Sequence, residues 1–321
     1  MFKEKIEAFC NSLGLDTIGF TKCRKFEELR EFYTYRKENN LENEFEEKDI
    51  EKRINPNLYL KEGKTIISIA FPYCSSEDFN CNNNGFSIYT KRYDYHRVVK
   101  KYLDEICKFI ESLGGRAVGL VDSNSLPERY IAYLSNVGFI GKNNMIITKK
   151  HGSYVFLGEI ESETKRTFNM IANYEECGEC RICIGECPTK SINKIKINPN
   201  ICLSYMTQKK ELNDKEINLL KKKGNIFGCD FCQLKCPYNE NLEGKALKEF
   251  EILDYMNEEP YIYANMDNKY FKEKISKTSC GWRGKNVIRR NAIINLKKKG
   301  VDIEEFKGNS EYINEYIDKL K

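Results

Sequence analysis

The sequence has very little histidine, since only His96 and His151 occur among 321 residues. This scarcity disfavours histidine-rich zinc sites and leaves little scope for Ser-His-Asp or Cys-His catalysis. No apolar run approaches the roughly 18 residues that a membrane-spanning helix needs. The first ten residues, MFKEKIEAFC, carry charges where a signal peptide is apolar. We therefore expect a cytoplasmic protein without a membrane partner, in which thiolates and carboxylates carry the chemistry.

Familiar nucleotide-binding motifs are absent as well. No GxGxxG sequence opens a helix, and the segment Gly138-Phe139-Ile140-Gly141-Lys142 lacks the spacing of a phosphate loop. NAD or FAD bound by a Rossmann motif is thus disfavoured. A redox role for this chain would need another carrier.

Cysteine, by contrast, is abundant and clustered. The chain has 14 cysteines, and eight of them lie between Cys177 and Cys236. In a reducing compartment such a cluster indicates metal or redox chemistry more than disulfide bonds. The other six share no such spacing, and we interpret them as buried apolar residues or incidental thiols: Cys10, Cys23, Cys74, Cys81, Cys107 and Cys280.

The eight clustered cysteines form two predicted sets of ligands for [4Fe-4S] clusters. The first run has the bacterial ferredoxin spacing Cys-x2-Cys-x2-Cys-x3-Cys-Pro, in which the fourth cysteine ligates the other cluster. The second run ends at Cys236-Pro237 and lacks its leading cysteine, which the isolated Cys202 can replace. The predicted sets are Cys177, Cys180, Cys183 and Cys236, and Cys187, Cys202, Cys229 and Cys232. Two zinc sites with four thiolates each are the weaker alternative.

Sequence patterns divide the chain into three parts. Helical and strand patterns alternate through the first 160 residues, which indicates an α/β domain. Near residue 161 the pattern changes to short apolar stretches between cysteines, and helical patterns follow after about residue 245. We expect domains at residues 1–165, 166–245 and 246–321. The main expected helices are 2–13, 95–113, 286–299 and 311–320, and the main expected strands are 16–20, 65–71, 116–121, 145–148 and 153–160.

Positive charge is concentrated near the C-terminal end. The formal net charge is +5, and residues 271–321 alone hold 13 Lys and Arg against 7 Asp and Glu. No acidic residue occurs from Ile275 to Val301. Such a block suits a polyanion such as nucleic acid, although a charge run by itself is more often a solvated helix face.

Asp122 is a candidate acid at the end of the expected strand 116–121. Its place before a loop and Pro127 puts it at the carboxyl edge of a sheet, where α/β proteins tend to bind ligands and where a carboxyl could donate a proton. From position alone, a hydrogen bond to its own turn or a cap on the helix near Pro127 is the commoner use. Both interpretations stay open at this point.

Together these residues resemble the epoxyqueuosine reductase family, cobalamin and iron-sulfur enzymes that complete queuosine at the wobble position of certain tRNAs. The resemblance covers nearly the whole chain. Besides the cysteines, it rests on an ordered series of segments: Glu51-Lys52-Arg53, Asp94-Tyr95-His96, Val121-Asp122-Ser123, 138–143, 152–159, 202–207, 228–233, 282–285 and Arg289-Arg290-Asn291-Ala292. It implies an α/β (α+β) cobalamin-binding domain, then a ferredoxin-like domain with two [4Fe-4S] clusters, then a short basic helical tail.

The resemblance also implies roles for particular residues. Asp122 would be the proton donor beside the cobalt. The cobalamin contacts implied by motif position are Arg53, Ser87, Asp122, Ile146, Thr148, Leu157, Ser204, Asp230 and Phe231. The candidates for tRNA phosphate contact are Lys210, Arg283, Lys285, Arg289 and Arg290. For the lone Trp282, filling the core is the expected use rather than stacking on a base.

His96 is interpreted as a structural residue and not as a cobalt ligand. The sequence after Asp94-Tyr95-His96 lacks the glycine of the mutase-type Asp-x-His-x-x-Gly motif. The resemblance therefore implies cobalamin bound without a histidine below the cobalt.

The implied reaction is the reduction of epoxyqueuosine to queuosine in the anticodon stem-loop of tRNA. Electrons would pass from an external low-potential donor through the clusters to cobalamin, and a monomer is the default expectation. One alternative is a cobalamin-dependent reductive dehalogenase, although residues 1–19 hold no twin-arginine signal and the basic tail would be idle. The other is a non-catalytic ferredoxin-type electron-transfer protein, which would bind no corrinoid.

Overall fold

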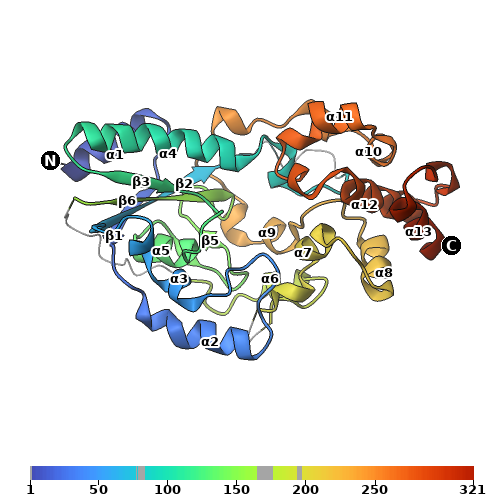
Figure 1. The fold of residues 1–321 in the computed structure, drawn as a ribbon, viewed down its shortest axis with the longest axis horizontal. Helices are drawn as coiled ribbons and strands as arrows, with labels where there is room; N and C mark the ends of the chain where they lie inside the picture. Colours follow the sequence, from blue (N-terminus) through green and yellow to red (C-terminus); the bar gives the residue numbers. More distant parts are fainter. Residues whose placement is uncertain (1, 77, 79–83, 165–175, 194–196) are drawn as a thin grey trace.

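The computed structural model describes residues 2–76, 78, 84–164, 176–193 and 197–321. Figure 1 shows a sheet with helices on both faces at the N-terminal end and a group of helices at the C-terminal end. Between them lies the segment that contains the clustered cysteines. The expected boundary at residues 165 and 166 lies outside the described residues.

A four-stranded sheet forms the centre of the N-terminal part. Its strands lie in the order β1 (Ile18–Lys22), β2 (Thr65–Pro72), β6 (Val155–Ser162) and β3 (Ala117–Leu120), and each neighbouring pair is antiparallel. Every residue of β2 is buried, as its apolar sequence TIISIAFP predicts. A separate antiparallel pair consists of β4 (Phe139–Ile140) and β5 (Ile146–Ile147).

One face of the sheet is covered by α1 (Phe2–Ser12) and α4 (Tyr95–Ser112) (Figure 1). Gly158 of β6 allows α4 to approach closely, because a Cβ atom there would lie 2.9 Å from side-chain atoms of both Phe71 and Val99. The side chains that fill this core include Ile67, Ile69, Phe71, Val99, Leu103, Ile106, Ile110 and Ile160. We call this side of the sheet the apolar face.

The opposite face is covered by α5 (Glu128–Leu134), with α2 (Arg30–Glu38) and α3 (Ile50–Ile54) beyond it. Gly19 of β1 makes room for the end of α5, because a Cβ atom there would lie 1.8 Å from the Ser135 carbonyl oxygen. Since side chains alternate along a strand, Glu159 and Glu161 of β6 point to this side, away from Ile160. Both glutamates are fully buried. We call this side the carboxyl face.

The cysteine-bearing segment contains α6 (Ile182–Glu186), α7 (Leu203–Gln208), α8 (Asp214–Lys223) and α9 (Phe231–Leu234). The C-terminal helices are α10 (Pro260–Asn265), α11 (Asn268–Glu273), α12 (Lys285–Lys298) and α13 (Glu311–Lys319). Residues of α7 and α8 share one core with residues of α10, α12 and α13: Leu203, Met206, Ile217, Leu220, Tyr263, Ile288, Ile293 and Ile317. The expected boundary at residue 245 therefore does not separate two cores.

The main expected elements are present, with ends displaced by at most a few residues. The expected helix 95–113 is α4, and the expected strand 65–71 is β2. None of the helices in the described part of the chain combines the length and apolar character required to cross a membrane.

Candidate active site

A cavity of about 1350 Å³ lies between the sheet and the cysteine-bearing segment. The sheet side contributes Tyr95, Asp122 and Leu157 to its walls, and the cysteine-bearing segment contributes Cys202 and Cys232. Pockets for drug-sized molecules usually have about 300–1,000 Å³. This cavity is thus large enough for a bulky cofactor together with part of a substrate.

Asp122 reaches the cavity from the loop that follows β3. Its backbone is in the left-handed region, with φ at 46°, and its side chain is 55% exposed because it faces the cavity. Its Oδ2 atom lies 3.0 Å from Nε2 of His96, whose Nδ1 atom lies 2.8 Å from Oδ1 of Asp94. His96, interpreted from the sequence as structural, therefore holds the side chain of the candidate acid.

Two expectations about Asp122 need correction. Because all pairs in the sheet are antiparallel, there is no common carboxyl edge, and the loop alone brings Asp122 to the cavity. The alternative of a helix cap is wrong too. Pro127 is the N-cap residue of α5 and no side chain caps it, while the Asp122 carboxylate bonds His96.

The pKa values of Asp122 and His96 shift in opposite directions. Burial among protein groups raises the pKa of Asp122, but hydrogen bonds from His96 and Tyr95 outweigh it, so the pKa lies below its usual value. Hydrogen bonds to Asp122 and Asp94 raise the pKa of His96 to about 9. At neutral pH, Asp122 is therefore ionised beside a protonated imidazole.

The residues implied as cobalamin contacts divide into two groups. Asp122, Ile146, Leu157, Ser204 and Phe231 line the cavity. Arg53, Ser87, Thr148 and Asp230 are not among the described side chains that line it. Ser87 and Thr148 are buried, and Asp230 accepts a hydrogen bond from the Ile88 backbone nitrogen at 2.7 Å.

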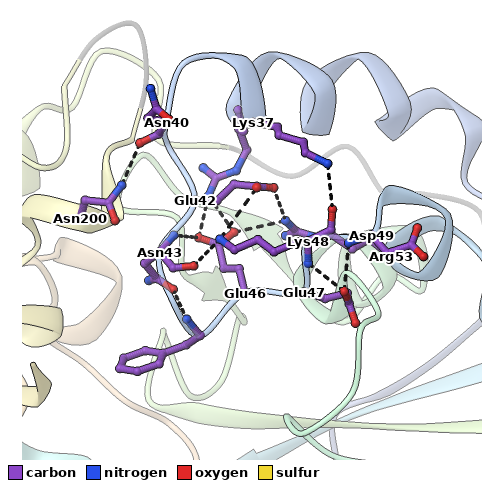
Figure 2. Close-up of polar contacts among 12 residues, drawn as sticks. Lys37, Asn40, Glu42, Asn43, Glu46, Glu47, Lys48, Asp49, Arg53 and Asn200 are labelled. Carbon is purple, nitrogen blue, oxygen red and sulfur yellow. Dashed lines mark hydrogen bonds and ion pairs between the residues drawn. The ribbon is translucent and has the colours of Figure 1, made fainter.

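The segment 40–49 forms part of the cavity wall that sequence reasoning missed. Phe45, Glu46 and Lys48 line the cavity. Figure 2 shows the polar network behind them, in which Glu46 lies 3.3 Å from Nη1 of Arg53. Asn200 of the cysteine-bearing segment donates to the Asn40 carbonyl oxygen at 2.9 Å (Figure 2). These contacts are tertiary, and no local motif signals them.

Charge interactions show which of the clustered thiols lie near one another. Burial raises the pKa of Cys183, and the neighbouring thiols of Cys177, Cys236 and Cys180 raise it further. Burial likewise raises the pKa of Cys232 to about 12, with contributions from the thiols of Cys202 and Cys187. Cys229 has Cys202 and Cys232 as its neighbours. The predicted crossing of Cys187 and Cys236 between the runs is therefore compatible with this arrangement.

The two groups of thiols lie differently with respect to the cavity. Cys187, Cys202, Cys229 and Cys232 all line it. Cys177 instead borders a separate hollow and lies 3.5 Å from the Lys142 backbone nitrogen. In the described part of the chain, no three His, Cys, Asp or Glu side chains form a compact single-ion site. A [4Fe-4S] cluster does not need such a single-ion site, because its four thiolates bind four different irons.

The remaining cysteines are as expected where they can be followed. Cys10, Cys23, Cys74, Cys107 and Cys280 are buried free thiols. Cys81 lies outside the described residues. These cysteines do not share the sequence spacing of the two clustered groups, and no chemistry is assigned to them.

The basic candidates differ in exposure. Lys210 is exposed, Lys285 donates to Oδ1 of Asn268, and Arg289 donates to the Ala264 carbonyl oxygen. Arg290 is fully buried, and its Nη1 atom donates to the carbonyl oxygens of residues 209 and 210. The prediction of a phosphate contact is therefore wrong for Arg290, whose guanidinium is used inside the protein.

Trp282 contradicts the expectation of a core residue. It lies in a short 3-10 helix, Gly281–Arg283, and is 58% exposed. Its ring meets that of Phe45 edge-on at a centroid distance of 5.3 Å and lies under the guanidinium of Arg283. Since Trp282 also lines the cavity, it presents an aromatic surface at the site.

Comparison with known proteins identifies the family. The family model for "Epoxyqueuosine reductase QueG, DUF1730" matches residues 53–123, and the model for the 4Fe-4S double cluster binding domain matches residues 176–239. A curated epoxyqueuosine reductase from Lactococcus garvieae is 34% identical over 303 residues, which cover 92% of this chain and 86% of the relative. The chain belongs to the epoxyqueuosine reductase family. The family assignment made from the sequence is thereby confirmed.

Solved structures of epoxyqueuosine reductases agree with this assignment. The enzyme from Streptococcus thermophilus has a TM-score of 0.85 and 34% identity, with 93% of this chain and 82% of that chain covered. An epoxyqueuosine reductase solved with an epoxyqueuosine-modified tRNA-Tyr stem loop has a TM-score of 0.89 and 31% identity, covering 99% of this chain and 90% of that one. The double-cluster match favours [4Fe-4S] clusters over zinc, and the family disfavours the dehalogenase and the plain ferredoxin.

Proposed function

We propose that this chain reduces epoxyqueuosine in tRNA to queuosine, the last step of queuosine synthesis. One observation carries the proposal: a single cavity is lined both by the candidate acid Asp122 and by the thiols of Cys187, Cys202, Cys229 and Cys232. An acid beside a one-electron carrier is what a proton-coupled reduction needs. The named relatives supply the substrate class.

We assign the large cavity to cobalamin and part of the substrate. Its volume, its aromatic residues Tyr95 and Phe231, and the buried Ser279 hydroxyl, which has no hydrogen-bond partner among the described residues, fit a bulky and partly polar cofactor. Ile146, Leu157, Ser204 and Phe231 would contact it directly, whereas Arg53, Ser87, Thr148 and Asp230 would support these walls. Bound cobalamin supplies a low-valent cobalt that acts as a strong nucleophile or reductant.

We infer a direction for the electrons from the positions of the two groups of thiols. We assign Cys177, Cys180, Cys183 and Cys236 to an outer cluster and the cavity-lining Cys187, Cys202, Cys229 and Cys232 to an inner one. The clusters held by these thiols would supply single electrons from an external low-potential donor to the cavity, the outer cluster on the donor side and the inner one on the cavity side. Crossed ligands keep the two clusters close, which single-electron transfer requires.

The proton path starts at His96. Converting the epoxide to an alkene and water takes two electrons and two protons. The His96 imidazolium, 3.0 Å away, gives its proton to the ionised Asp122, and the Asp122 carboxyl group then protonates the leaving oxygen. Solvent restores the proton on His96, so the same path supplies the second proton. Asp94 keeps the imidazole oriented and favours its protonated form.

The anticodon stem-loop would approach over the C-terminal helices. Lys210, Arg283, Lys285 and Arg289 are the proposed phosphate contacts, and the exposed Trp282 offers a surface on which a base can stack. Because the proposed substrate is a tRNA, we propose that the protein acts in the cytoplasm. We also propose that it is a monomer. Replacing Lys285 by alanine should lower the salt dependence of tRNA affinity by about one phosphate contact, while the control Lys101→Ala on α4 should not.

The decisive experiment measures conversion of epoxyqueuosine in tRNA by nucleoside analysis. The protein is purified anaerobically and supplied with cobalamin and a low-potential reductant. Queuosine formation is expected with the intact chain. Absence of conversion by a protein whose visible spectrum shows bound cobalamin and loaded clusters would rule out the proposed reaction.

A further inference from the structure

A pair of carboxyl groups beside Asp122 has no part in the reaction proposed above, although one of them, that of Glu128, also lines the cavity. Glu128 is the first residue of α5, and Glu159 lies on β6 beneath it. Oε1 of Glu128 accepts a hydrogen bond from the Asp122 backbone nitrogen at 2.7 Å and another from Nδ2 of Asn124 at 2.8 Å. Glu128 therefore closes the turn that gives Asp122 its left-handed backbone.

Glu159 is fully buried and its two oxygens have different surroundings. Oε1 lies 3.3 Å from the Ser68 hydroxyl, which can donate to it. Oε2 has no donor among the described residues. The carboxyl group of Glu128 is within hydrogen-bonding reach of Glu159. Two ionised carboxylates cannot hydrogen bond to each other, so this contact needs a proton on one of them.

We propose that Glu128 and Glu159 share one proton and that this protonated pair holds Asp122 in position in the cavity. The inference rests on the proposed function, because it makes Glu128 a positioning residue for the acid of that reaction. The shared proton gives Glu159 Oε2 a partner and leaves Glu128 Oε1 free to accept from the Asp122 turn.

The charges around the pair favour this protonation state. Burial, followed by the negative charge of Asp122, raises the pKa of Glu128 to about 7. Burial, followed by the charge of Glu128, raises the pKa of Glu159 well above its usual range. The other ionisable groups that face the pair are Arg129 beside Glu128, Glu161 on the same face of β6, and His96 beyond Asp122. Without the shared proton, the carboxylates of Asp122, Glu128 and Glu159 would place three negative charges around the Asp122 turn.

The test compares Glu128→Gln and Glu128→Ala with a matched control, Glu161→Gln. Glu161 is also fully buried on β6, but its carboxylate accepts from the Leu60 backbone nitrogen instead of touching the Asp122 turn. Steady-state rates would be measured across pH for proteins with equal cobalamin and cluster content. Hydrogen exchange of residues 121–126 gives a readout that is independent of activity.

Wild-type kcat should fall above pH 7 to 8 as the pair loses its proton. Glu128→Gln keeps the acceptor oxygen and should retain kcat within a few fold, while its alkaline decline moves up toward pH 9, where His96 loses its proton. Glu128→Ala should lower kcat by about 10- to 100-fold with little change in KM, because a misplaced catalytic group costs about this much. It should also speed hydrogen exchange of residues 121–126. Glu161→Gln should match the wild type in both measurements.

An unchanged pH profile in Glu128→Gln, or wild-type hydrogen exchange in Glu128→Ala, would overturn the proposal. Should Glu128→Ala fail to fold, the pH profile of Glu128→Gln decides. Should the wild type not convert epoxyqueuosine, the proposed function fails. The protection factors of residues 121–126, which correct exchange rates for their intrinsic increase with pH, are then compared at pH 6 and pH 9 in Glu128→Gln and the wild type. The positioning role predicts lower protection at pH 9 in the wild type alone.

Discussion

The two faces of the central sheet carry opposite kinds of side chain on the same strands. On β6, Ile160 packs into the apolar face, while its neighbours Glu159 and Glu161 bury carboxyl groups on the carboxyl face. Burying a carboxyl group is costly unless it is paired or protonated, so stability alone does not select this arrangement. The comparison indicates that the apolar face stabilises the fold and that the carboxyl face supports the chemistry of the cavity.

The largest expected effect concerns the acid on the side of the cavity. Asp122→Asn should keep cobalamin and the clusters but lose turnover by about 10²–10⁴-fold, because a positioned acid typically contributes this much. Ile106→Val on the apolar face is the control and should leave turnover unchanged. Nucleoside analysis of the tRNA product measures both, and full activity of Asp122→Asn would remove that residue from the reaction.

A substitution on the apolar face should lower stability and leave turnover unchanged. Leu103 is 1% exposed between α4 and the sheet, and Leu103→Ala should lower the free energy of unfolding by about 2–5 kcal/mol. Turnover per folded molecule should stay unchanged. Chemical denaturation and active-site titration give the two quantities, and a turnover loss as large as that of Asp122→Asn would erase the distinction between the faces.

The buried Glu161 predicts a pH-dependent stability. Burial raises its pKa to about 8, so the folded protein holds a proton that the unfolded chain loses near pH 4.5. Stability from this group is therefore full below about pH 4.5 and is lost as pH rises to about 8. Glu161→Gln should remove this loss, which for a pKa raised from 4.5 to about 8 is on the order of 5 kcal/mol, so the variant gains stability relative to the wild type as pH rises from 4.5 to 8.5. Thermal denaturation of both proteins at the two pH values measures this gain. The same stability difference between variant and wild type at both pH values would contradict the raised pKa of Glu161.

The smallest effect on stability is expected for His96, whose backbone belongs to α4 and whose side chain contacts Asp122. Its pKa is raised to about 9, so its ion pairs stabilise the fold fully below about pH 6.5 and are lost as pH rises through 9. His96→Gln should cost about 1 kcal/mol at pH 6, allowing for solvent screening, and nothing at pH 9.5. Equal destabilisation at both pH values would indicate a packing role instead.

Periodicity and spacing predicted much of this molecule because they are local. The helical stripe of 95–113 and the apolar run of 65–71 correspond to α4 and β2, and the cysteine spacing predicted the double-cluster domain that the family model matches at residues 176–239. Strand order is not local, and alternating patterns fit parallel and antiparallel sheets alike. A glutamate in a strand normally indicates a solvated side chain, so the burial of Glu159 could not be anticipated.

The same limit applies to the basic C-terminal region. A run of basic residues in the sequence does not show which of their side chains point to solvent. The packing of α12 against α7 and α13 decides which of its arginines remain at the surface. Trp282 shows the converse case, because the ring expected inside the protein is exposed beside the cavity.

Arg290 has a consequence for how RNA binding is mapped in this protein. Successive residues on a helix are rotated by about 100°, so the adjacent arginines of α12 face different surroundings although they read as one basic motif. Arg289 is partly exposed, whereas Arg290 joins α12 to the chain segment that follows α7. An alanine scan would register lost tRNA binding at Arg290 through unfolding. Footprints of bound RNA therefore need to be compared with the melting temperature of each variant before a contact is assigned.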